Sequence, residues 1–124
     1  MTNFSYLSSG EEWFELESFS AVLVDVSAAK LSDVLLNRLA AFRPGIVAFF
    51  GRSSEAWHDA YDQLMIREDI ECLTIWYSNE PIDEVVWEFF NVHVPHSSES
   101  REAFVIGVGS DWLLRAAEKS QAEE

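Results

Sequence analysis

Four short apolar runs, separated by segments of helical periodicity, constrain the fold of this chain more than any other feature of its sequence. The runs span residues 20–26, 45–51, 71–77 and 103–109 and are rich in β-branched and aromatic side chains. Residues 20–26 are long enough and apolar enough for a buried strand, and the other three runs also predict strands. Strands that alternate with helices predict an α/β fold built on a mainly parallel sheet.

A segment of helical spacing follows each run. Two of these helices are expected over residues 31–42 and 54–65, a third opens at Asn79 and Pro81 and contains residues 83–91, and a fourth spans 110–119. Pro44 and Gly45 end the first helix, and Ser53 or Ser54 caps the second. We expect the first two helices to turn the following residues inward: Leu31, Val34, Leu35, Leu39, Phe42, and Trp57, Ala60, Tyr61, Leu64.

Right-handed crossovers place helices on both faces of such a sheet, so we expect a small three-layer domain with four to five strands. A length of 124 residues suits one domain over residues 1–124, with a frayed polar tail at 120–124.

Three stretches of the sequence leave alternatives open or lack helical and strand periodicity. Residues 11–17 fit a helical turn or an edge strand, residues 91–95 alternate like a short strand or extended connection, and residues 96–102 are typical of a loop.

The charge of the chain restricts its partners. Eight Lys and Arg stand against 22 Asp and Glu, which gives a net charge of −14. Such a field repels nucleic acids and anionic membranes and attracts basic proteins.

No apolar run reaches the length of a membrane span, and the first residues do not resemble a signal peptide. With Cys72 as the single cysteine, expected to be buried and inert, the sequence favours the cytoplasm.

One indole is predicted to lie among carboxylates. In the third helix, Ile82, Val85, Val86, Phe89 and Phe90 share one side. The other side then holds Asp83, Glu84, Trp87, Glu88 and Asn91. An apolar anchor within a charged rim is typical of a binding hot spot, and an indole can receive Lys or Arg through a cation–π contact. The alternative is that Trp87 covers a neighbouring loop.

The second helix carries a further acidic row of Glu55, Asp59 and Asp62. Together the two acidic faces favour a small binding protein that neutralises a basic partner, either a nuclease-type toxin or a nucleic-acid-binding protein. In size, composition and absence of a catalytic motif the chain resembles immunity proteins against nuclease toxins and other inhibitors of that kind. The likeness is one of class and carries no matched residues.

Two other functions stay open. Asp25, Arg52, Ser53 and Ser110 follow strands at the edge where open parallel sheets bind ligands, which would suit a doubly wound enzyme for a nucleotide or phosphate. Ordinary turns with serine caps are the alternative, because the longer phosphate-binding loop pattern is missing. Aromatic residues make up 14% of the chain, which also permits a homodimeric interaction module.

His93 and His96 have a spacing that could bind a metal, but Pro95 between them removes the helical alignment of the two rings. We therefore expect no metal site. Because the sequence contains no catalytic motif, we also expect no cofactor and name no catalytic residue.

Overall fold

The structure is a computed structural model that describes residues 4–7, 21–27, 30–41, 43–93, 103–107, 115–116 and 118–119. It confirms an α/β fold with a parallel sheet. In chain order the elements are β1 (Phe4–Leu7), β2 (Ala21–Asp25), α1 (Asp33–Ala41), β3 (Ile46–Phe50), α2 (Ser54–Glu68), β4 (Leu73–Tyr77), α3 (Ile82–Glu88), the π-helix η2 (Phe89–His93) and β5 (Ala103–Gly107).

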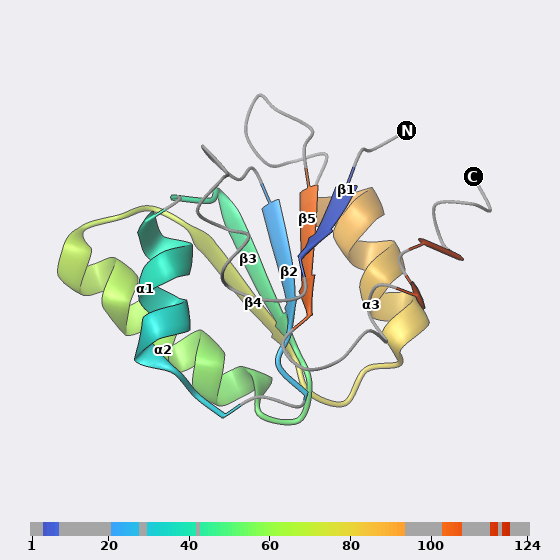
Figure 1. Cartoon of the computed structure of the whole chain (residues 1–124), viewed down its shortest axis with the longest axis horizontal. Helices are drawn as coiled ribbons and strands as arrows, with labels where there is room; N and C mark the ends of the chain where they lie inside the picture. The colour runs from blue at the N-terminus through green and yellow to red at the C-terminus, as the bar shows by residue number, and fades with distance from the viewer. Residues whose placement is uncertain are drawn as a thin grey trace.

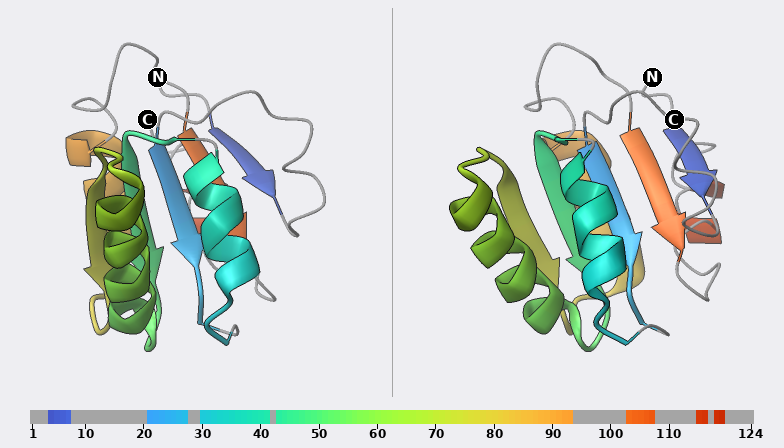
Figure 2. Two further views of the ribbon diagram at one scale, coloured as in Figure 1. Left: turned by 90° about the vertical axis from the view of Figure 1, so that its left-hand side faces the viewer. Right: turned by 60° about the vertical axis from the view of Figure 1, so that its left-hand side comes forward.

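The strands pair in the order β1-β5-β2-β3-β4, and every pair is parallel (Figure 1). β2 lies between β5 and β3, with Val22 opposite Phe104 on one side and Val47 on the other. β4 lies at one edge, and Figure 2 shows that edge beyond β3. All five residues of β2 are buried, which fits the β-branched composition of a central strand.

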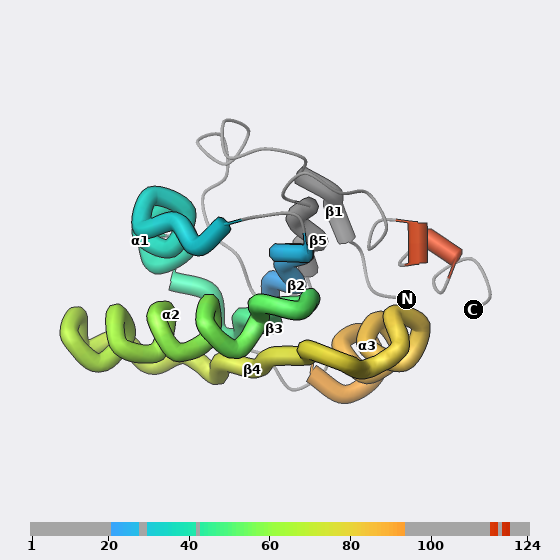
Figure 3. The backbone as a smooth tube through the Cα atoms, turned by 90° about the horizontal axis from the view of Figure 1, so that it is seen from below, coloured from blue at the N-terminus to red at the C-terminus, as the bar shows by residue number. Residues whose placement is uncertain are grey.

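Successive residues of a strand point to opposite faces of the sheet, and this alternation divides the core in two. Val24 and Phe49 face α1 and α2, where the Phe49 ring lies 6.0 Å from Trp57 and 5.8 Å from Tyr61. Leu23 lies in the other cluster, together with residues of α3 and η2. Figure 3, viewed along the strands, shows α3 across the sheet from α1 and α2. Burial of each large side chain contributes about 1.5–3 kcal/mol.

The inward face of α1 agrees only in part with the prediction. Leu39 is buried and Leu35 is partly buried, as predicted, whereas Val34 is 63% exposed and Leu31 is also exposed. Leu36 and Ala40 are buried in their place. Leu31 precedes the helix, which begins at Asp33, so helical spacing does not apply to it. Val34 lies on the side of the helix turned away from the buried cluster. Phe42 lies outside the described residues.

α2 is three residues longer than predicted and ends at Glu68, and the backbone of the C-cap residue Asp69 adopts the left-handed conformation. Its buried residues include Trp57, Tyr61 and Leu64, as predicted, and Ala60 is partly buried. Ser53 occupies the N-cap position, but its side chain makes no capping hydrogen bond, so the expected cap interaction is absent at that residue.

The helix that follows β4 continues further than predicted. Residues 91–93 are not extended but belong to η2, in which Phe89 and Phe90 are buried and the Asn91 side chain donates a hydrogen bond of 2.8 Å to the Trp87 carbonyl. The prediction was wrong because Pro95 restricts the residue directly before it, and a helix can still continue to His93.

β1 was not predicted, since four residues with a polar Ser5 give no clear apolar run. Of the fourth predicted helix, the described residues 115–116 and 118–119 are helical. The predictions for residues 11–17, 96–102 and 120–124 lie outside the described residues, as does His96.

Candidate functional site

Trp87 lies on the outer side of α3. Its side chain is 59% exposed, while Val85, Val86 and the following phenylalanines are buried. Asp83 and Glu84, one turn earlier on the same helix, are both exposed. Residues three and four apart on a helix are neighbours, so the two carboxylates flank the indole. Within the described residues, this exposure favours an outward indole over one that covers a loop.

Glu88 is held more firmly than the other acids of α3. Its Oε1 atom lies 3.1 Å from Nε2 of His93, and the same nitrogen lies 3.0 Å from the Tyr77 hydroxyl. Burial raises the pKa of Tyr77, and the nearby Glu88 carboxylate raises it further. This cluster joins η2 to the end of β4. Glu88 therefore has a structural contact that Asp83 and Glu84 lack in the described part of the chain.

The acidic row on α2 extends toward β4. Asp62 accepts a hydrogen bond of 3.4 Å from the Thr74 hydroxyl. His58 lies 3.0 Å from Asp59 and its ring is 4.5 Å from the ring of Trp76. Asp59 is exposed and Asp62 is partly buried. The structure thus brings two of the predicted binding residues close to a second indole, while Glu55 lies exposed one turn earlier.

Sequence reasoning missed Trp76. Residues 71–77 were predicted to form a strand, but an apolar run gives no sign of whether a strand is central or at an edge. In the structure Trp76 is 41% exposed and Leu73 is 54% exposed, because β4 is an edge strand. Trp76 is exposed because β4 lies at the edge of the sheet. The local sequence could not predict this position, because strand order is not encoded in local periodicity.

Two residues of β4 have backbone hydrogen-bonding groups that point away from β3. Leu73 donates its N–H to Gly45 on the β3 side, and the Tyr77 carbonyl accepts from Gly51 on the same side. Backbone groups alternate in direction along a strand, so the N–H and C=O groups of Thr74 and Trp76 point away from β3. No strand of the described residues pairs with this edge.

The sequence around this edge is acidic throughout. Between residues 68 and 93 there are seven Asp and Glu and no Lys or Arg. These are Glu68, Asp69, Glu71, Glu80, Asp83, Glu84 and Glu88. The edge strand itself has no charged residue between Leu73 and Tyr77. We call β4, with Trp76, Asp59 and Asp62 on the α2 side and Trp87 and Glu84 on the α3 side, the acidic edge.

The residues predicted for a small ligand lie elsewhere. Asp25 is fully buried at the end of β2, where Oδ1 accepts a hydrogen bond of 2.9 Å from the Ser27 N–H. This is the turn-capping role expected of an aspartate at this position. Arg52 and Ser53 are exposed in the turn after β3, and Ser110 lies outside the described residues.

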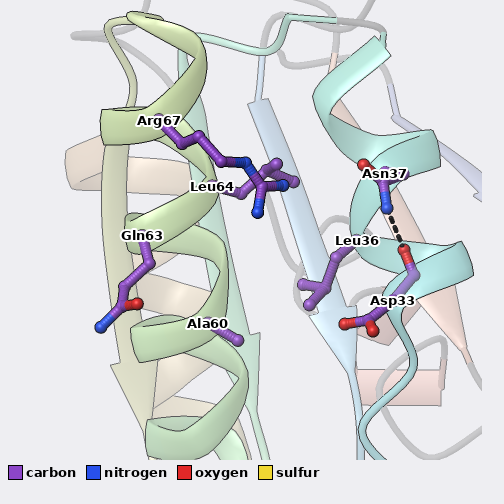
Figure 4. Close-up of a pocket in the computed structure, with 7 residues that line it drawn as sticks. All are labelled: Asp33, Leu36, Asn37, Ala60, Gln63, Leu64 and Arg67. Atoms are coloured by element: carbon purple, nitrogen blue, oxygen red, sulfur yellow. Dashed lines mark hydrogen bonds between the residues drawn. The ribbon is translucent and has the colours of Figure 1, made fainter.

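A shallow groove of about 290 Å³ lies between α1 and α2 (Figure 4). Arg67 extends across it from α2, and on the α1 side Asn37 donates a hydrogen bond of 2.7 Å to the Asp33 carbonyl. Its volume is at the lower end for a small-molecule site. Within the described residues, no three His, Cys, Asp or Glu are grouped to hold a metal ion, and no helix is long and apolar enough to cross a membrane.

The fold and this geometry define the class: an α/β protein on a parallel sheet, with an acidic edge that exposes two indoles. Residues 4–114 match the family described as "Domain of unknown function (DUF7684)", and the chain belongs to that family. No curated protein and no solved structure gives a significant match.

Proposed function

We propose that this protein acts in the cytoplasm by binding and neutralising a basic protein, as immunity proteins and other small inhibitors do. The partner would be a nuclease-type toxin or another protein with a cationic nucleic-acid-binding surface. The observation that carries the proposal is the exposure of Trp87 beside Asp83 and Glu84, within a stretch that contains no Lys or Arg. Exposed indoles are costly to leave in water and are enriched in interfaces.

The chemistry of the acidic edge fits a cationic protein surface. Carboxylates accelerate encounter with a basic partner by long-range attraction, which weakens as salt is added. Once docked, Lys or Arg of the partner can stack on Trp87 or Trp76 and pair with the flanking acids. Such a surface would fill a cleft that the partner otherwise uses for phosphates.

We also propose that the whole chain forms the three-layer domain with four to five strands and helices on both faces.

The partner is obtained as the product of an adjacent gene that encodes a basic protein, or from the basic proteins captured from the native host at low salt. Its association rate is then measured by stopped-flow fluorescence over a range of ionic strengths. The matched variants are Glu84→Lys and Asp33→Lys. Both residues are exposed acids in the first turn of a helix, so the two substitutions change the net charge and the helix terminus in the same way.

We expect Glu84→Lys to slow association several-fold at low salt, and Asp33→Lys to have a smaller effect because it lies on α1. Trp87→Ala should weaken the complex by about 2 kcal/mol or more, mainly through faster dissociation. Equal association rates for the two lysine variants, together with unchanged affinity of Trp87→Ala, would overturn the proposal.

A second candidate is a small-ligand site at the strand ends. Two fully buried polar atoms there, Oδ2 of Asp25 and Oγ of Ser54, have no hydrogen-bond partner among the described residues. Buried polar atoms are normally paired, so a ligand or water would satisfy them. Thermal shift against nucleotides, flavins and divalent metals tests this reading. A ligand at 100 times its dissociation constant should stabilise the protein by about 2.7 kcal/mol.

A further inference from the structure

The edge of β4 has the properties of a strand that receives another strand. It is composed of Thr, Ile and aromatic residues that favour extended backbone, and it contains neither proline nor charge. Natural proteins usually protect such an edge with charges, a proline or a covering segment, because it otherwise pairs with other chains. Within the described residues, this edge has none of these protections.

We propose that the basic partner binds by adding an extended, cationic segment to β4 as a further strand. This inference rests on the proposed function and specifies its binding mode. The N–H and C=O groups of Thr74 and Trp76 that point away from β3 would bond the backbone of the added strand. Pairing at both residues fixes the register of that strand.

Charge and burial predict which side chains the added strand carries. On the α2 side it meets the Trp76 indole and the carboxylates of Asp59 and Asp62, which favour Lys or Arg. On the α3 side it meets Leu73 and Ile75, which favour apolar residues. Successive residues of a strand point to opposite faces, so the segment should alternate basic and apolar residues.

A second copy of this chain is the other conceivable occupant. It would place a charge of −14 against −14, with Glu71 and Glu80 flanking β4 in each copy. Like charges across a pairing edge are destabilising, so charge complementarity favours the cationic segment.

The test uses the full chain and three synthetic peptides in isothermal titration calorimetry. The first alternates Lys and Val. The second has the same sequence with backbone N-methylation at alternate residues, which removes the N–H donors on its pairing edge and keeps the charge. The third has the same composition with the Lys and Val in separate blocks. We expect the N-methylated peptide to bind at least about tenfold more weakly than the first, because two or more backbone hydrogen bonds are lost. The third peptide should also bind more weakly, because its Lys and Val side chains cannot separate to the two sides of the edge.

Amide hydrogen exchange identifies where the first peptide binds. The amides of Thr74 and Trp76 should exchange rapidly in the free protein and be protected at least about tenfold by the alternating peptide. Thr74→Pro removes one outward N–H and should weaken binding, whereas Thr74→Ala removes only the hydroxyl contact with Asp62. If Thr74→Pro does not fold, the N-methylated peptide still decides the matter.

Equal binding of the first and second peptides would overturn the added strand, although the charged surface of the proposed function would remain. Failure of every peptide to bind also overturns it, and the lysine variants with the natural partner then decide the proposed function separately. Protection of both amides that increases with protein concentration in the absence of peptide would assign the edge to a second copy and overturn the cationic occupant.

Discussion

Gly51, in the turn after β3, adopts a backbone conformation that favours glycine. Its φ is +132°, and a Cβ atom there would lie 2.8 Å from the backbone nitrogen of Ser27. Only glycine adopts this conformation without strain, and the close approach lets the turn after β3 contact the turn after β2. The same turn begins α2, so this glycine sets where that helix starts.

We therefore expect Gly51→Ala to lower the free energy of unfolding by about 2 kcal/mol or more, from backbone strain and the clash with Ser27. The urea midpoint of the variant, compared with that of the parent protein, measures the loss. Arg52→Ala is the control, since that neighbour is exposed and should change stability by less than about 0.5 kcal/mol. An unchanged midpoint for Gly51→Ala would contradict the close contact.

Cys72 gives a pH-dependent prediction. Burial raises the pKa of its thiol to about 11, and burial also raises the pKa of the neighbouring Tyr61. An unfolded cysteine has a pKa of about 8.5, so the folded state holds this proton more tightly. The resulting stabilisation is complete below about pH 8.5 and is lost as the pH rises through the folded pKa.

The melting temperature should consequently fall as the pH increases from about 8.5 to 11, and alkylation of the thiol should follow the raised pKa. Calorimetry over this pH range and an iodoacetamide rate profile provide the two measurements. Cys72→Ala should show a smaller alkaline loss of stability. The sequence predicts a buried Cys72, whereas the structure has it partly buried against the core. Alkylation that reaches its maximum near about pH 8.5 would show that this partial burial does not raise the pKa of the thiol.

At the scale of elements, the junction of α3 and η2 depends on contacts that no local pattern contains. The Tyr77 hydroxyl, the His93 ring and the Glu88 carboxylate are brought together from the end of β4 and the end of the helix. A single π-helical turn is uncommon and needs such compensation. The sequence indicated the amphipathic helix correctly, but its π-helical end follows from tertiary contacts 16 residues apart in the chain.

Tyr77→Phe tests that junction. Removal of the hydroxyl leaves the His93 and Glu88 pair without one partner, so we expect a loss of about 1 kcal/mol in the free energy of unfolding. Tyr61→Phe is the matched control, because the buried Tyr61 hydroxyl lies beside the weakly bonding Cys72 thiol and makes no well-formed hydrogen bond. Urea denaturation compares the two, and an equal cost for both substitutions would contradict the role of the cluster.

The acidic edge was only half predicted because part of it depends on tertiary contacts that no local sequence pattern contains. Amphipathic spacing placed Trp87 outward with Asp83 and Glu84, and the structure agrees. The contribution of β4 could not be inferred, because an edge strand and a central strand have the same apolar composition until their pairing is known. Pairing joins residues that are far apart in the sequence. For the same reason, neither β1 nor the strand order could be predicted from local sequence patterns.

For the whole molecule, net charge is the property with the broadest effect. At −14 the folded chain repels itself, since compaction brings the carboxylates closer together. We expect the melting temperature to rise by several degrees as sodium chloride is increased from low to physiological concentration, because the Debye length shortens to about 8 Å. Differential scanning calorimetry measures the shift. A melting temperature that falls with added salt would show that attractive ion pairs dominate instead.

The position of β5 has a consequence for how the chain acquires its structure during synthesis. Among the described strands, β5 comes last in sequence and lies between β1 and β2, which come first. The segment Phe4–Leu7 thus leaves the ribosome about a hundred residues ahead of its hydrogen-bonding neighbour. Vectorial folding can assemble β2, β3 and β4 early, but the N-terminal strand must wait for Ala103–Gly107 before it can join them.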